Sequence, residues 1–268
     1  MDDRIATNRA MWDERVALHV GSDFYDVDSF RAGRSSLQPF EIDEVGDVTG
    51  RSLLHLQCHF GLDTMSWARL GANVTGVDFS PPAVEAATKL AAEIGVADQA
   101  DFVCSDVYDA RTAVGQRTYD IVYTGHGALC WLPDITRWAE IVASSLNPGG
   151  FLYLAEFHPF AEMLGWEQPV IEYDYFHDPA GLFDDSPGSY VDFDAPTVNN
   201  ASHEWRHPLG EILTALATRG LRLEFLRERS FTLWQRLPSL ELRDDRTYDF
   251  PAGEPRVPMT YSLKASLT

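Results

Sequence analysis

The chain has 268 residues, enough for one large domain or two small ones. It carries 41 Asp and Glu against 21 Lys and Arg, and the resulting formal charge of −20 argues against nucleic acid or an anionic membrane as a partner. Its three cysteines are scattered, so no disulfide framework is expected. No apolar run nears the roughly 18 residues of a membrane span, and the start lacks signal-peptide features. We therefore expect a soluble cytoplasmic protein.

The first 48 residues are expected to cap the mouth of a sheet. Residues 8–19 are predicted to be helical, and the irregular stretch that follows is rich in aromatic side chains.

Residues 49–160 alternate short apolar segments with helical ones. Strands are predicted over 53–57, 74–78, 101–104, 119–123 and 151–156, and helices over 62–70, 81–94 and 135–146. Asn147-Pro148-Gly149-Gly150 is expected to separate the last of these helices from the strand that follows. The alternation indicates βαβ units, a parallel sheet, and helices on both faces because crossovers are right-handed.

The pattern changes after residue 160. Residues 161–202 show weak periodicity and many aromatic and acidic side chains, and we interpret them as an inserted lid that contributes to the substrate site. Residues 203–268 are expected to complete the core sheet, with a helix over 208–219 and strands over 221–226 and 258–267.

Three successive strand ends carry groups suited to a nucleoside. The loop 57–61 leads into a helix N-terminus, Asp78 ends the next strand, and Asp106 follows the third. A carboxylate can accept ribose hydroxyl protons or the exocyclic amine of adenine. This order leaves open whether the ligand is a nicotinamide cofactor or S-adenosylmethionine.

Three stretches in this order read LLHLQCHFGLDTMSWARLGANVTGVDFSPPAVEAA, FVCSDVYD and YDIVYTGHGALCWLPDITRWAEIVASSLNPGGFLYLAEFHPF. Together they resemble the class I S-adenosylmethionine-dependent methyltransferases of the small-molecule type. The resemblance implies an α/β, doubly wound, mostly parallel seven-stranded sheet with an antiparallel last strand, a Rossmann-like fold with S-adenosylmethionine as its cofactor. The resemblance also implies the residues that bind the cofactor. Asp78 would bind the ribose, and Asp106 and Val107 would flank the adenine. Phe79 and Gly125 would also line the cofactor pocket.

The glycine loop departs from the family pattern. Gln57 and His59 stand where the family has glycine, and only Gly61 remains. The loop is similar to a variant found in some small-molecule methyltransferases, so we expect the side chains of Gln57 and His59 to bind the methionyl end. Tyr25 and Arg34, from the N-terminal cap, are further candidates for that end.

Methyl transfer needs a base only when the acceptor must lose a proton early. His126 after the fourth strand, and Glu156 and His158 after the fifth, are the candidate catalytic residues. We expect methylation of an oxygen or nitrogen atom of a small molecule, aromatic or cationic because aromatic and acidic groups share the insert. No metal is expected: His203 and His207 have a helical ligand spacing, but Pro208 disfavours helix there.

Two other functions stay open from the residues. An NAD(P)-dependent oxidoreductase would need the three-glycine fingerprint that this loop lacks. A non-catalytic nucleoside-binding protein on the same fold is compatible with the missing glycines. The oligomeric state is not predicted.

Overall fold

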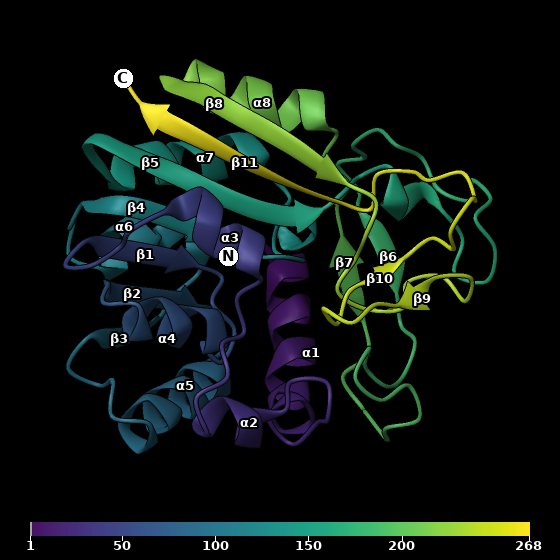
Figure 1. Cartoon of the computed structure of the whole chain (residues 1–268), viewed down its shortest axis with the longest axis horizontal. Coiled ribbons are helices and arrows are strands. Elements are labelled where there is room, and N and C mark those ends of the chain that lie inside the picture. The colour runs from purple at the N-terminus through teal and green to yellow at the C-terminus, as the bar shows by residue number, and fades with distance from the viewer. Residues whose placement is uncertain (1) are drawn as a thin grey trace.

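The computed structural model describes residues 2–268 and contains a seven-stranded sheet in the order β3-β2-β1-β4-β5-β11-β8 (Figure 1). Its strands are β1 (Ser52–Leu56), β2 (Asn73–Asp78), β3 (Ala100–Cys104), β4 (Tyr119–Thr124), β5 (Leu146–Phe157), β8 (Leu221–Arg229) and β11 (Thr260–Leu267). β1 to β5 pair in parallel, and β11 is antiparallel to both of its neighbours. This confirms the predicted fold class.

Two apolar cores lie on opposite faces of the sheet. One is formed with α6 (Ala110–Ala113), α7 (Ile135–Ser145) and α8 (Leu209–Thr218). The other is formed with α4 (Leu62–Arg69) and α5 (Pro81–Glu93) and includes side chains of the N-terminal segment. Side chains of β1 point to both faces of the sheet. Because both faces are covered, β1 is buried from Leu53 to Leu56. The doubly wound arrangement follows from this burial.

Local signals set most helix boundaries in the core. The Ser80 hydroxyl accepts a hydrogen bond from the amide of Ala83, and Pro81 takes the first position of α5. The Asp134 carboxylate caps α7 through the amide of Arg137. These are the starts that the sequence predicts.

The fifth strand begins earlier than expected. β5 starts at Leu146 and includes the Asn-Pro-Gly-Gly segment, which forms an irregularity in the pairing with β4 rather than a separate turn. A Cβ atom on Gly150 would lie 2.9 Å from the carbonyl oxygen of Asp120. Glycine is therefore required for the two backbones to approach this closely.

The N-terminal segment contains three helices: α1 (Asp3–Val20), α2 (Val27–Arg31) and α3 (Pro39–Val45). The Asp2 carboxylate caps α1, so this helix begins five residues before the predicted start at Asn8. α2 and α3 were not predicted because each is too short to show a clear period. α1 stands at the carboxyl ends of the parallel strands, between the sheet and the later insertions (Figure 1).

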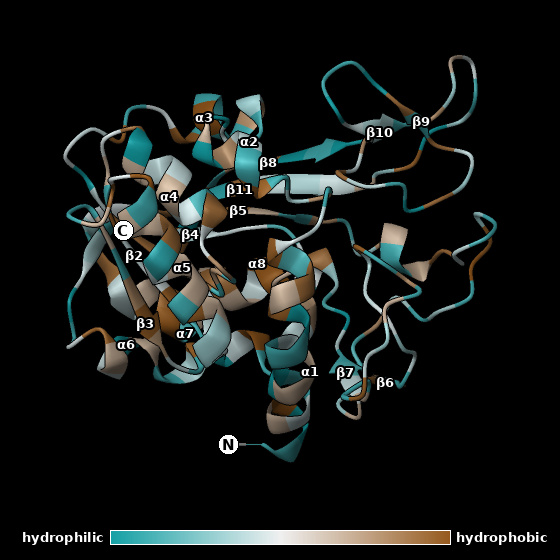
Figure 2. Cartoon of the chain, turned by 90° about the horizontal axis from the view of Figure 1, so that it is seen from below, coloured by the Kyte–Doolittle hydropathy of each residue, from teal (hydrophilic) through white to brown (hydrophobic). Residues whose placement is uncertain are grey.

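Two long segments lie on the far side of α1 from the sheet (Figures 1 and 2). The first holds a 3₁₀ turn η3 (Ala161–Met163) and the pair β6 (Leu182–Asp184) and β7 (Ser202–Glu204). The second, residues 230–259, separates β8 from β11 and holds β9 (Glu241–Leu242) and β10 (Tyr248–Asp249). The segment 230–259 was not predicted. It interrupts residues 203–268, which were expected to complete the sheet.

Within residues 2–268, no helix combines the length and the apolar character needed to cross a membrane.

Candidate functional site

A cavity of about 1310 Å³ lies where the parallel strands end. Its walls come from the N-terminal helices, the strand-end loops, the insert after residue 160 and the segment 230–259. Cavities that bind one drug-sized ligand usually have about 300–1,000 Å³. This cavity is therefore large enough for two small molecules side by side.

Twelve of the thirteen expected site residues line this one cavity. They are Tyr25, Arg34, Gln57, His59, Gly61, Asp78, Phe79, Asp106, Val107, Gly125, His126 and Glu156. The structure brings them together from six separate segments of the chain. The thirteenth, His158, is not among the lining residues.

The loop after β1 has the backbone conformation of a glycine-rich loop, although only one of its three left-handed residues is glycine. Gln57, His59 and Gly61 have φ angles of 59°, 51° and 81°, in the left-handed region that glycine adopts most easily. Side-chain contacts hold the two non-glycine residues there: Gln57 Nε2 donates to the carbonyl of Ala128 over 2.8 Å, and His59 Nδ1 accepts from the amide of Phe60 over 2.7 Å. The loop geometry is thus preserved by different chemistry.

Gln57 also has an unpaired acceptor. Its Oε1 atom is buried and has no hydrogen-bond partner in the part of the chain that the structure describes. A buried amide oxygen left without a donor costs about 1–3 kcal/mol. Since Gln57 lines the cavity, a ligand with an N–H group would remove this cost.

Asp78 ends β2 beside this loop. Its Oδ2 accepts from the amide of His59 over 2.7 Å, and its Oδ1 accepts from the amide of Ser80 over 3.0 Å. Each carboxylate oxygen has a further lone pair for a ligand. Burial raises the pKa of Asp78 to about 6, so the group is ionised at neutral pH.

The end of the neighbouring strand supplies a second carboxylate. Cys104 of β3 pairs with Asp78, and Asp106 follows two residues later. The Asp106 carboxylate caps the short turn η1 (Val107–Asp109) through the amide of Tyr108, and burial raises its pKa. Phe79 and Val107 add apolar walls, as a site for a flat base requires.

The N-terminal cap is hydrogen-bonded to the loop after β1. Because Nδ1 of His59 accepts the Phe60 amide, its Nε2 carries the proton and donates to Nδ1 of His19 over 2.8 Å. His19 Nε2 then donates to the hydroxyl of Ser189 over 2.8 Å. Burial lowers the pKa of His19 to about 4 and that of His59 also, so both rings are neutral. The chain connects α1, the loop and the insert.

Tyr25 and Arg34 line the cavity but also hold the cap in place. The Tyr25 hydroxyl is hydrogen-bonded to that of Tyr190 in the insert. Arg34 Nη2 donates to the carbonyls of Tyr25 and Asp26. Its buried Nε atom has no hydrogen-bond partner within residues 2–268 and lies 3.7 Å from a carboxylate oxygen of Asp26.

The three expected catalytic residues differ in their surroundings. His126 follows β4, and its buried Nε2 has no hydrogen-bond partner among the described residues. Burial lowers the pKa of His126 to about 3, which makes it a hydrogen-bonding group rather than a strong base.

The carboxylate of Glu156 is held by backbone amides. Its carboxylate accepts from the backbone amides of Gly127, Ala128, Leu129 and Phe157. These bonds shape the loop after β4 and use most of the acceptor capacity of the side chain.

The imidazole of His158 is hydrogen-bonded to groups that do not line the cavity. Its Nε2 is 2.8 Å from Glu228, and its Nδ1 accepts from the amide of Phe160. With both nitrogens engaged away from the cavity lining, this placement gives the expected catalytic role of His158 no support.

The half of the cavity beyond the β4 loop contains Trp166, from the aromatic insert expected to face the acceptor, and further residues that were not predicted as site residues. Its polar and aromatic lining includes Glu162, Trp166, Glu204, Arg206, Trp234 and Arg236. Burial, with the nearby Glu162 carboxylate, raises the pKa of Glu204 to about 7. The amide of Trp205 donates to the carbonyl of Cys130 over 2.7 Å and so fixes Glu204 beside the β4 loop. No local sequence signal marks Glu204, because its position depends on this long-range contact.

Comparisons with known proteins agree with this geometry. A model of the methyltransferase domain family matches residues 54–152. A ubiquinone biosynthesis O-methyltransferase from Xanthomonas euvesicatoria pv. vesicatoria is 29% identical over 230 residues, which span 84% of this chain and 86% of that protein.

Two solved structures share the fold. An S-adenosylmethionine-dependent methyltransferase from Mesorhizobium loti aligns with a TM-score of 0.60 and 21% identity, over 88% of this chain and 99% of its own. The DhpI–SAH complex aligns with a TM-score of 0.57 and 15% identity, over 98% of this chain and 96% of its own.

Proposed function

The chain belongs to the class I S-adenosylmethionine-dependent methyltransferases, and we propose that it methylates a hydroxyl oxygen of a small aromatic acceptor. The observation that carries the proposal is one continuous cavity, which runs from the strand-end carboxylates to a half lined by acidic and aromatic side chains. Oxygen is preferred to nitrogen because curated relatives are named O-methyltransferases. The same matches favour methyl transfer over the oxidoreductase and the non-catalytic alternatives.

The residues at the strand ends fit the cofactor. Asp78 would accept hydroxyl protons of the ribose, and Asp106 the amine of the adenine, with Phe79 and Val107 against the faces of the base. The unpaired Gln57 Oε1 would accept from the methionyl ammonium group, which restores the missing hydrogen bond. When bound, S-adenosylmethionine supplies a methyl group that its sulfonium centre already activates.

The other half of the cavity fits a flat acceptor. Trp166 and Trp234 lie with ring centroids 5.4 Å apart, and the Arg236 guanidinium lies 4.1 Å from the centroid of Trp166. Arg236 is held by the carbonyls of Leu164 and Gly165, so its guanidinium is fixed beside Trp166. Aromatic walls bury a ring and exclude water from the reacting atoms.

Glu204 is the residue that we propose as the proton acceptor. A base works best when its pKa lies near the working pH, and the pKa of Glu204 is raised to about 7. His126 has a free nitrogen at the cavity and a low pKa, so it is assigned to orienting the acceptor by a hydrogen bond. The chain otherwise contributes positioning and exclusion of water.

The test is methyl transfer from methyl-tritiated S-adenosylmethionine to a panel of phenols and catechols, with anilines and benzylamines of matching shape as controls. We expect label in the hydroxyl compounds and an equal amount of S-adenosylhomocysteine. Label only in the amines would contradict the assignment to oxygen. Cofactor binding without label in any acceptor would contradict the proposed reaction.

A further inference from the structure

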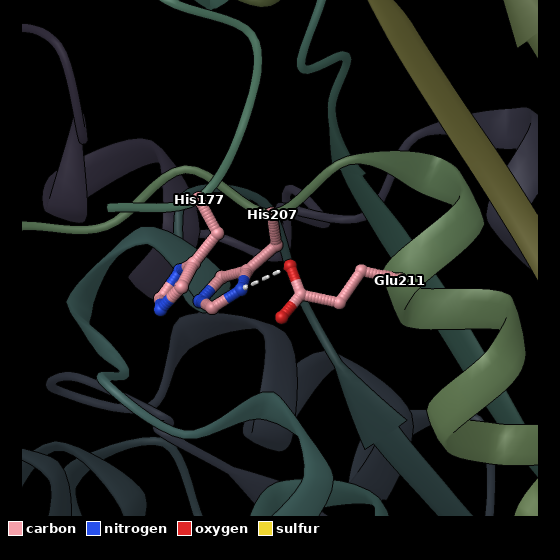
Figure 3. Close-up of side chains that lie close together, drawn as sticks. All are labelled: His177, His207 and Glu211. Carbon is pink, nitrogen blue, oxygen red and sulfur yellow. Dashed lines mark hydrogen bonds and ion pairs between the residues drawn. The ribbon is translucent and has the colours of Figure 1, made fainter. Parts of the chain in front are cut away.

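A cluster of three metal-ligand side chains lies at the edge of the cavity, and of the three His207 lines it. One nitrogen each of His177 and His207 and one carboxylate oxygen of Glu211 all lie within 4.8 Å of one another (Figure 3). His177 belongs to the insert, His207 precedes α8, and Glu211 lies in the first turn of that helix. The three come from segments that the fold must bring together.

Hydrogen bonds to backbone carbonyls occupy one nitrogen of each imidazole and leave the other available to an ion. His207 Nε2 is 2.8 Å from the carbonyl oxygen of Leu132, which can only accept, so Nε2 carries the proton. Its Nδ1 lies 3.4 Å from Glu211 Oε2, so a bound ion would take the place of any proton that these two atoms share. His177 Nδ1 donates to the carbonyl oxygen of Arg206 over 3.3 Å, which leaves its Nε2 free.

Metal-binding histidines usually show this pattern, in which the second ring nitrogen donates to a carbonyl or a carboxylate. It fixes the tautomer that a metal needs before the ion arrives. A surface pair of histidines without such bonds would have no preferred tautomer. The side chain of His207 is only 2% exposed, so its orientation is set by the fold.

From this geometry we infer that His177, His207 and Glu211 form a binding site for a divalent first-row metal ion such as Zn²⁺. Two imidazoles and one carboxylate are a known Zn²⁺ ligand set that leaves a fourth position for water. Ligands of one tetrahedral ion lie about 3.3 Å apart, since each bond is about 2.0 Å. The pair His207 and Glu211 already meets this spacing at 3.4 Å, and a small movement of the half-buried His177 would complete the set.

The ion would tie the insert to the core. His177 now contacts the segment before α8 by stacking on His207, with ring centroids 5.1 Å apart, and by its hydrogen bond to the Arg206 carbonyl. A shared ion would add coordination bonds to His177 on the insert and to His207 and Glu211 on the core. Since His207 is three residues from Glu204, the same ion would limit movement of the wall that holds that carboxylate.

The test uses tag-free full-length protein that has been stripped with a chelator, titrated with ZnCl₂ by calorimetry and with CoCl₂ by visible absorption. We expect one ion per chain, with the absorption of a tetrahedral Co²⁺ site. His177→Gln and Glu211→Gln should each weaken Zn²⁺ binding at least tenfold, because each removes one ligand. His203→Gln is the matched control and should bind like the wild type.

Both ligand substitutions lie at half-buried positions, and circular dichroism verifies that each variant is folded. Wild-type affinity in His177→Gln, or no binding at micromolar Zn²⁺, would overturn the site. Limited proteolysis within 161–202 provides a second measurement that does not depend on activity. Zn²⁺ should slow cleavage in the wild type and in His203→Gln but not in His177→Gln, and an equal rate with and without bound Zn²⁺ would overturn the link to the insert.

Discussion

The backbone amide of His59 donates a 2.7 Å hydrogen bond to the carboxylate of Asp78. The side chain proposed to hold the ribose therefore also fixes the loop proposed to hold the methionyl end. This bond joins the ends of β1 and β2 directly, and it explains how a loop with one glycine keeps its conformation. The two parts of the cofactor site depend on the same carboxylate.

Asp78→Asn tests this dependence. The substitution keeps the shape of the side chain but replaces one acceptor oxygen with an amide that faces backbone N–H groups. Loss of a buried hydrogen bond costs about 1–3 kcal/mol, which corresponds to roughly 5- to 150-fold weaker binding of S-adenosylhomocysteine. Calorimetry measures this value. Asp101→Asn, at an exposed position of β3, is the matched control, and equal affinities in the two variants would remove Asp78 from the site.

Gly61→Ala tests the loop itself. Gly61 has a φ of 81°, and an added Cβ would lie 2.5 Å from the ring of Phe102. We expect strain and clash together to cost about 2–4 kcal/mol of unfolding free energy and to weaken cofactor binding. Urea unfolding and calorimetry measure the two effects.

Gly95→Ala provides the control for that substitution. Gly95 also has a positive φ, of 75°, but an added Cβ would meet nothing within 4 Å. It should show the cost of the backbone conformation, about 1 kcal/mol, without loss of cofactor binding. Equal stability of the two variants would contradict a role for the close approach to Phe102.

Glu204→Gln tests the proposed base. Because burial raises the pKa of Glu204 to about 7, the ionised form that accepts a proton is present above that pH and disappears below it. The wild-type kcat should therefore rise with pH through about 7. The variant should lose this rise and fall about 10²- to 10⁴-fold in kcat. Glu167→Gln, at an exposed position of the insert, should keep the wild-type profile, and an unchanged profile in Glu204→Gln would exclude this base.

His126→Gln and His158→Gln should separate the two histidines. His158 is bonded to Glu228 and to the Phe160 amide away from the cavity, so its substitution should lower stability by about 1 kcal/mol and leave kcat and KM unchanged. His126 lines the cavity, so its substitution should raise the KM for the acceptor without changing affinity for the cofactor. Steady-state kinetics with a lower kcat in His158→Gln would reverse this assignment.

The core could be predicted because its signals are local. Strand and helix periods, the cap at Ser80 and the acidic strand ends lie within a few residues of the structure that they specify. Asp78 and Asp106 follow from this pattern, since carboxyl ends of parallel strands meet at one edge.

The acceptor side could not be predicted in the same way. Glu204 reaches the cavity because the amide of Trp205 meets the carbonyl of Cys130, a contact between residues far apart in the chain. The segment 230–259 has two very short strands and no clear period. The i,i+4 spacing of His203 and His207 is that of two metal ligands on one helix. In the structure, the possible metal ligands near His207 are instead Glu211 and His177 from the insert.

The most direct measurement is a crystal structure of the protein with S-adenosylhomocysteine. We expect the ribose hydroxyls within hydrogen-bond distance of Asp78 and the adenine between Phe79 and Val107. The sulfur should face the half of the cavity that contains Glu204 and Trp166. A ligand bound elsewhere, or a ribose that does not contact Asp78, would contradict the central claim.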